Sequence, residues 1–348
     1  MPTPAELRRV PSTSASKSFR GLSVLSFRRN QIDYMEPSTE EEMYLLELLH
    51  SRLAASLQSL HSYPNLSLPF LNDLLDALLC TGFDFKALLF LLLSRNPALI
   101  SLPSLDRAVS YLLDFYIKVL DLCNDVSLSL TSLRHWNGHA DIAATALRPS
   151  PPQLSRASRA LSRLLLRNSL EKKMTRSWSA PRQLQSTPVC FAAPRGSDFG
   201  SAGVLAAAVH AMSTLLVFTI WAMTAAFPCC GGTVSPPVPS PASGPRQMAW
   251  AVAMVGLQER IVGEREREGK GEVWMLAETQ AVERLGREVM EAMRNEEETA
   301  AVAAKMEEAI QDLGEGLGLF EKNLREVFDC VVRSREEVLR FVDEGSRH

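Results

Sequence analysis

Apolar residues recur every three or four positions along most of the chain, which is the spacing of one helix face. The spacing predicts helices over residues 39–62, 70–95, 104–133, 153–168, 250–267, 273–295 and 296–313, and a final helix from 320. Almost no stretch alternates apolar and polar residues as a half-buried strand does. We therefore predict an all-α protein: an elongated helical bundle with one long apolar helix and disordered linkers.

The clearest pattern lies between Ser104 and Leu133, where apolar residues alternate steps of four and three. They are Leu112, Tyr116, Val119, Cys123, Val126, Leu130 and Leu133. Such a heptad seam predicts a partner helix packed along it. We expect the helix to end near the following HWNGH sequence, because Asn137-Gly138 favours a turn.

Breaks in the pattern divide the chain into regions. They are a disordered basic arm (1–20), an N-terminal helical bundle (21–145), a basic amphipathic helix and linker (146–201), an apolar helix (202–228), a linker rich in Pro, Gly and Ser (229–247) and a C-terminal helical region (248–348). In the last region Gly314, Gly316 and Gly318 indicate either a break in the helix or a tight approach to a neighbour.

The run from Val204 to Phe227, VLAAAVHAMSTLLVFTIWAMTAAF, has no charged side chain. A helix of roughly 20 apolar residues can cross the hydrocarbon core of a bilayer, so the run is long enough for a single membrane span. Only part of it is strongly apolar, however. It could equally be the central helix of a soluble bundle, packed through the small residues Gly203, Ala207 and Ala211.

A different kind of helix is predicted over residues 153–168. Leucines lie on one side and four arginines lie on the other, namely Arg156, Arg159, Arg163 and Arg167. The basic face is either an ordinary solvated surface or a surface that meets anionic lipid. Nucleic acid is not expected as a partner, because no aromatic side chains that could stack on bases interleave the arginines.

Two short motifs occur in the linkers. RSWSAP, Arg176 to Pro181, has the spacing that phosphoserine-reading 14-3-3 proteins recognise when Ser179 is phosphorylated, although short motifs recur by chance. Cys229 and Cys230 follow the apolar run, where juxtamembrane cysteines are candidates for S-acylation; two free thiols in a loop are the alternative. Acylation would place this end of a span in the cytosol, whereas the positive-inside rule places the other end there.

The formal net charge is −3, but the charges are segregated: basic residues prevail before residue 30 and over 148–195, and acidic residues prevail from 259 onward. The six cysteines show neither zinc-site nor disulfide spacing. His135 and His139 lie four apart with no third ligand nearby, so we predict no metal site. Phosphate loops, nucleophile elbows and Cys-His pairs are also lacking, and we expect neither a catalytic site nor a cofactor.

Two stretches, SFRGLSVLSFRRNQIDYM (18–35) and DRAVSYLLDFYIKVLDLCNDVSLSLTSLRHW (106–136), together resemble the plant ROH family, whose relatives are the BYPASS proteins. The C-terminal stretch EEAIQDLGEGLGLFEKNLREVFDCVVRSREEVL (307–339) and the apolar run with its following Cys-Cys also stand in the family's order. The departures lie mainly in the linkers. The resemblance implies a helical, largely cytosolic protein, often with one predicted membrane segment, that binds a subunit of the exocyst tethering complex.

The expected function is that of a non-enzymatic, membrane-associated adaptor that binds an exocyst subunit and modulates polarised secretion. Its expected location is the membrane, with a single span as one option, and the cytosol. The resemblance to BYPASS relatives implies an alternative, a soluble developmental regulator that limits a root-derived mobile signal. The two differ in whether the apolar run crosses a bilayer or packs inside the protein.

Overall fold

The computed structural model describes residues 37–64, 66–166, 200–227, 248–268 and 276–345. Within these ranges every regular element is helical and none is a strand, which confirms the all-α prediction. The basic arm (1–20) and the Pro/Gly/Ser linker (229–247) lie outside the described residues. Met1–Glu41 and Glu42–His348 are separate compact units, and the packing considered below is that of the second unit.

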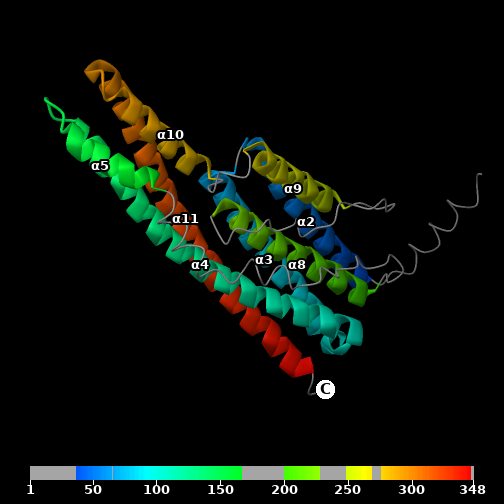
Figure 1. Ribbon diagram of the computed structural model, residues 1–348. Helices are drawn as coiled ribbons and strands as arrows, with labels where there is room; N and C mark the ends of the chain where they lie inside the picture. The colour runs from blue at the N-terminus through cyan, green and yellow to red at the C-terminus, as the bar shows by residue number, and fades with distance from the viewer. Residues whose placement is uncertain (1–36, 65, 167–199, 228–247, 269–275, 346–348) are drawn as a thin grey trace, which may run out of the picture. The chain divides into compact units, whose positions relative to one another are not determined.

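The elements follow one another along the chain as Figure 1 labels them. They are α2 (Pro37–Ser59), η1 (Leu60–Ser62), α3 (Leu68–Arg95), η2 (Pro97–Ser101), α4 (Pro103–Leu147), α5 (Leu154–Leu165), α8 (Ser201–Ala226), α9 (Ala249–Glu268), α10 (Ala277–Ala292) and α11 (Glu296–Gly345). The two short elements, η1 and η2, are 3-10 helices that follow α2 and α3.

The start of α3 is held by one group directly before it in the sequence and by one from α10, far along the chain. Ser67 is an extended N-cap whose hydroxyl accepts a hydrogen bond from the Phe70 N–H at 3.3 Å. The Glu278 carboxylate accepts a second from the Leu68 N–H at 3.0 Å. These acceptors satisfy two of the N–H groups that a helix leaves unpaired in its first turn. The beginning of α10 is thereby joined to the beginning of α3.

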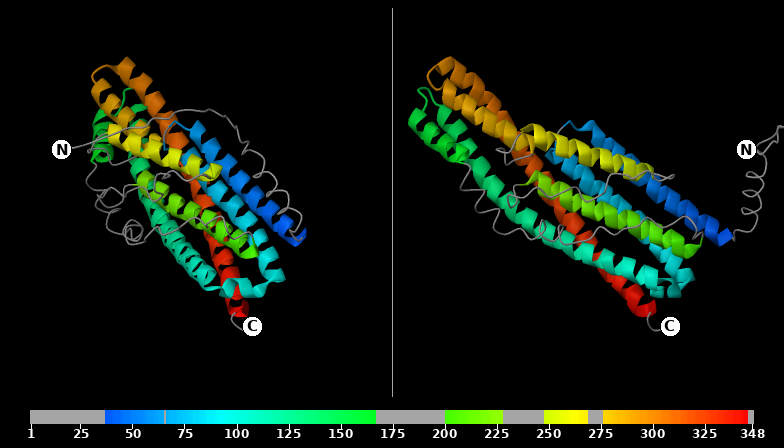
Figure 2. Two further views of the ribbon diagram at one scale, coloured as in Figure 1. Left: turned by 90° about the vertical axis from the view of Figure 1, so that its right-hand side faces the viewer. Right: turned by 45° about the vertical axis from the view of Figure 1, so that its right-hand side comes forward.

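α4 and α11 form a long antiparallel pair (Figure 1, Figure 2). Arg134 of α4 is paired with Glu321 of α11, and Arg148, directly after α4, is paired with Glu307, which comes earlier in α11. Every position of the predicted heptad seam on α4 is buried. The prediction that a partner helix packs along this seam is therefore confirmed.

The predicted end of this helix near HWNGH is wrong, because α4 runs without interruption to Leu147. The side chain of Asn137 donates a hydrogen bond from Nδ2 to the Ile310 carbonyl of α11 at 3.1 Å. Trp136 and Ala140, on either side, are buried in the core. Packing against the neighbouring helix outweighs the local turn preference of Asn137-Gly138.

α11 is also continuous, so the three glycines do not break it. The alternative, a tight approach, is confirmed at one of them. A Cβ placed on Gly316 would lie 2.9 Å from Cδ1 of Leu68, whereas nothing lies within 4 Å of the same position on Gly314 or Gly318. Gly316 therefore allows α11 to pass close to the beginning of α3.

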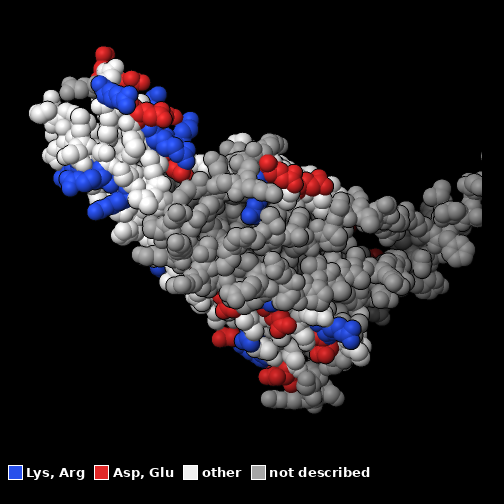
Figure 3. Space-filling view, in the orientation of Figure 1, with Lys and Arg blue, Asp and Glu red and all other residues white. Residues whose placement is uncertain are grey.

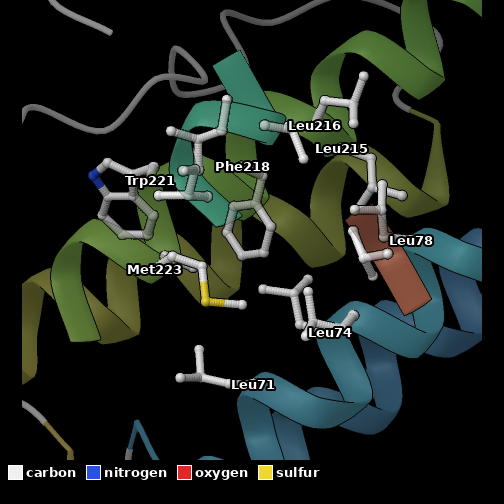
Figure 4. Close-up of a cluster of buried hydrophobic side chains, with 14 of the residues drawn as sticks. Leu71, Leu74, Leu78, Leu215, Leu216, Phe218, Trp221 and Met223 are labelled. Atoms are coloured by element: carbon white, nitrogen blue, oxygen red, sulfur yellow. The ribbon is translucent and has the colours of Figure 1, made fainter. Parts of the chain in front are cut away.

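The apolar helix α8 packs against both α3 and α4. In the core, Phe218 and Met223 of α8 lie near Leu74 of α3, and Leu215 lies near Leu78 (Figure 4). Phe227, at the end of α8, stacks on Phe320 of α11 with ring centroids 6.0 Å apart. Nearly the whole length of α8 is buried, from Val204 to Ala226. α8 is thus a core element of this structure.

α2 and α9 run parallel to each other (Figure 1, Figure 2). Trp250, early in α9, lies 6.1 Å from the ring of His50, and Arg260, later in α9, donates a hydrogen bond to the Leu60 carbonyl just after α2. His61 contacts the Ala253 carbonyl through Nε2 at 3.0 Å. Side-chain contacts from η1 and α2 therefore hold α9 in place.

Candidate membrane and protein interaction surfaces

α5 is fixed to the bundle by its apolar side. Trp136 of α4 donates a hydrogen bond from Nε1 to the Leu164 carbonyl at 3.0 Å, and this contact is buried. On the other side, a Cβ on Gly286 of α10 would lie 2.9 Å from Cδ2 of Leu164, so the two helices approach closely. Ala157 and Leu161 are also buried. One face of α5 is therefore packed against α4 and α10.

The opposite face of α5 is basic and exposed. Arg156, Arg159 and Arg163 are all exposed, and no carboxylate of the described residues lies within ion-pair distance of them. Arg159 donates only to the Ser155 carbonyl of its own helix, at 3.1 Å. In Figure 3 basic side chains lie at the left edge of the view, where Figure 1 places α5, without acidic ones beside them. Arg167, the fourth predicted member, lies outside the described residues.

His135 and His139 face each other on α4 with ring centroids 5.2 Å apart. Burial, then the nearby His135 and Arg163, lower the pKa of His139. A guanidinium this close disfavours a bound cation. Among the residues with described positions, no group of three His, Cys, Asp or Glu side chains could hold a metal ion.

Among the helices that the structure describes, two are long and apolar enough to cross a membrane: α8 and, unexpectedly from the sequence, α3. The most apolar window of α8 is 83% buried within the protein, and that of α3 is 50% buried. Both ends of the predicted membrane segment, Val204 and Phe227, are buried as well. A helix of a buried core can have the same apolar composition as a membrane span, so composition does not separate the two. The burial of α8 inside the protein favours the alternative in which the run is a core helix.

The exposed side of α3 carries two phenylalanines that sequence reasoning did not single out. Phe83 is 76% exposed and Phe90 is 63% exposed. They are seven residues apart, which places them on one face of the helix. The missed signal is that both fall between the buried leucine positions of α3. Exposed aromatic side chains grouped in this way are typical of interaction surfaces.

Two half-buried histidines, His50 of α2 and His210 of α8, both lie close to Trp250, with ring centroids 6.1 Å and 5.8 Å from that of the indole. Burial, and secondarily the proximity of His210, lower the pKa of His50 to about 4. Burial also lowers the pKa of His210. Both imidazoles are therefore neutral at physiological pH, and their rings act as packing groups between α2, α8 and α9.

Ser179, Cys229 and Cys230 lie outside the described residues. Phosphorylation of Ser179 with 14-3-3 binding, and acylation of the two cysteines, stay predictions from the sequence.

Comparison with known proteins gives a consistent result. The family model described as "Protein ROH1-like" matches residues 10–175 and 166–342. Protein ROH1A of Arabidopsis thaliana is 30% identical over 97% of this chain and 98% of its own length. Protein ROH1D of the same plant is 27% identical over 97% of this chain and 99% of its own length. No solved structure matches.

Proposed function

Because this chain belongs to the ROH1-like family, we propose that it is a non-enzymatic adaptor that binds an exocyst subunit and attaches to anionic membrane through α5. The exocyst partner is carried over from the resemblance of the chain to ROH proteins. The attachment rests on one observation, the exposed arginine face of α5 without carboxylate partners. In this proposal α8 stays in the core and does not cross the bilayer.

Electrostatics supports α5 as the attachment surface. Each Lys or Arg near an anionic bilayer contributes on the order of 1 kcal/mol to binding. Arg156, Arg159 and Arg163 would together contribute about 3 kcal/mol. Leu154 and Leu166, at the two ends of the helix, are 39% and 56% exposed and could enter the lipid headgroup region. The other face of α5 is already packed, so only the basic face is available.

Burial argues against insertion of α8. Withdrawing α8 would expose the faces of α3 and α4 that it covers, including Leu71, Leu74 and Leu78. Exposing one such side chain costs about 1.5–3 kcal/mol. Peripheral attachment through α5 leaves this core intact.

Sedimentation with vesicles tests the lipid contact. The full chain should pellet with vesicles of phosphatidylserine and phosphatidylcholine, and less so as salt is raised. Reversal of Arg156, Arg159 and Arg163 to Glu should abolish pelleting. The matched control reverses three exposed arginines elsewhere, Arg284, Arg325 and Arg333, with the same change in net charge. Equal loss in both triple variants, or no loss in the first, would refute the α5 contact.

The exposed face of α3 is our candidate surface for the protein partner. It belongs to the predicted N-terminal bundle and presents Phe83 and Phe90 to solvent. Replacing both by Ser should abolish co-precipitation of exocyst subunits while the helix content stays constant. Replacing Leu319, which is 53% exposed on α11, by Ser is the matched control. If the wild-type chain captures no exocyst subunit, this partner is wrong.

A second candidate, a soluble developmental regulator, is favoured by the same burial of α8. Cell fractionation separates the possibilities. A peripheral adaptor pellets with membranes at low salt and is released by carbonate, whereas a soluble regulator stays in the supernatant at low salt. Retention in the pellet after carbonate treatment would instead show that an apolar helix, α8 or α3, spans the bilayer.

A further inference from the structure

A cavity of about 410 Å³ opens between the second half of α3, the first half of α4 and the last turns of α11. Its apolar walls are formed by Phe85, Leu89 and Phe90 of α3 together with Val338 and Phe341 of α11. The cavity is within the size range of small-molecule sites, which are lined mainly by apolar and aromatic side chains. None of these residues belongs to the basic face of α5.

The walls are held at a fixed spacing by polar contacts between α3 and α11. Lys86 of α3 is paired with Glu337 of α11 beside the cavity. Further back, Asn72 and Asn323 are hydrogen-bonded. Lys86 lies fourteen residues after Asn72, and Glu337 lies fourteen residues after Asn323. The two helices therefore run parallel and in register. The cavity is thus a preformed gap between two rigid elements.

The inner end of the cavity carries one polar group without a partner. Tyr116 of α4 lines the cavity and is only 1% exposed, yet its hydroxyl forms no hydrogen bond with any residue whose position is described. Burial, then the nearby Cys330 and Glu337, raise the pKa of this phenol. The hydroxyl stays protonated and can donate or accept. Because Tyr116 lines the cavity, its hydroxyl is available to a molecule bound there.

The outer end carries charge. Arg340 lines the cavity, is exposed, and has no ion-pair partner in the described part of the chain. Glu337 is already neutralised by Lys86. Glu344, also at the cavity, is the one lining carboxylate that no described cation neutralises. A bound anion would be attracted by Arg340 and repelled by Glu344.

We propose that this cavity binds a small amphipathic molecule with an aromatic body and one anionic group. The body lies between the phenyl rings of α3 and α11, a polar atom at its inner end meets the hydroxyl of Tyr116, and the anion lies against Arg340. This site is separate from the proposed membrane contact, but it shares Phe90 with the proposed protein-partner face of α3, so a bound molecule and the protein partner would compete there.

The probe for the test is anilinonaphthalene sulfonate, which has an aromatic body, an N–H group and a sulfonate, and which fluoresces when it leaves water. Titration of the folded full chain should show saturable binding of one molecule per chain. Val338→Trp fills the cavity and should abolish it. Tyr116→Phe keeps the shape and should weaken it roughly threefold to tenfold.

Two surface variants test the charge assignment without disturbing the core. Arg340→Gln should weaken binding several-fold, and Glu344→Gln should tighten it. Phe83→Ala, outside the cavity, is the control for adsorption to exposed aromatic surface and should leave binding unchanged. If Val338→Trp fails to fold, the opposite effects at Arg340 and Glu344 decide the matter.

Several results would overturn the proposal: no saturable binding, binding of several molecules per chain, or equal responses to Arg340→Gln and Glu344→Gln. Light scattering gives a further check. If wild type is a dimer and Phe90→Ser makes it a monomer, a second copy covers the cavity and the small-molecule assignment is wrong.

Discussion

Asn323 donates a hydrogen bond from Nδ2 to Oδ1 of Asn72, 3.1 Å away, inside the contact between α11 and α3. Both side chains are buried, at 8% and 6% exposure. The two amides satisfy each other in surroundings that are otherwise apolar. Such a pair contributes little net stability. Replacing only one of the two residues destabilises the protein, because the remaining amide would stay buried without its partner.

The first prediction follows from this pair. Asn323→Leu leaves the Asn72 amide unpaired and should lower the free energy of unfolding by about 1–3 kcal/mol. The double replacement Asn72→Leu with Asn323→Leu removes both polar groups and should recover much of that loss. Urea denaturation followed by circular dichroism measures both values. If the double variant loses the sum of the two single losses, the amides are not coupled.

The three glycines of α11 give a second prediction. Gly314→Ala and Gly318→Ala meet nothing within 4 Å and should each stabilise by about 0.5–1 kcal/mol, because Ala is the better helix former. Gly316→Ala puts a methyl group against Leu68, which is buried, and should instead destabilise the protein. Thermal melts of the three variants, side by side, test the close approach. The same gain at all three positions would contradict it.

A third prediction concerns acid. The pKa of His50 is lowered to about 4 in the folded state, while the unfolded chain takes up the proton near 6.5. The unfolded state therefore binds more protons between these values, and stability should fall as the pH drops from about 6.5 toward 4, by at most about 3 kcal/mol from this group. His50→Leu should flatten this dependence in urea titrations at several pH values. Leu128→Gln, at an exposed position of α4, should leave it unchanged.

The contact between Trp136 and α5 gives a fourth prediction. Trp136→Phe removes the donor to the Leu164 carbonyl and should cost roughly 1–3 kcal/mol, because that acceptor is buried. The loss should appear locally, as faster trypsin cleavage after Arg156, Arg159 and Arg163. Cleavage after Arg325, on α11, is the internal reference. An equal rise at all of these arginines would indicate general unfolding instead.

Periodicity carried enough information to predict the helices and the α4 seam, because a helix that packs on one side must repeat its apolar residues every three or four positions. The turn preference of Asn137-Gly138 predicted a helix end that does not occur, and the glycines of α11 left a break and a close approach open, of which only the approach occurs, at Gly316. The side chain of Asn137 reaches the Ile310 carbonyl, a residue 173 positions away. No local window of sequence contains that contact.

The candidate surfaces were predictable to different extents. The arginine face of α5 follows from spacing within one helix, and its three described members are exposed as expected. Phe83 and Phe90 could have been placed opposite the leucines of α3 by the same reasoning. The cavity beside Phe341 could not, because it requires the relative positions of three helices that are distant in sequence.

The contact between the beginnings of α3 and α10 affects how the protein folds during its synthesis. The Ala277 N–H donates to the Leu66 carbonyl at 3.0 Å, and Glu278 reaches Leu68 across 210 positions of sequence. During translation, α3 leaves the ribosome long before either partner has been made. In the nascent protein the first turn of α3 therefore lacks these hydrogen-bond partners, and its leucines stay uncovered, until most of the chain has emerged.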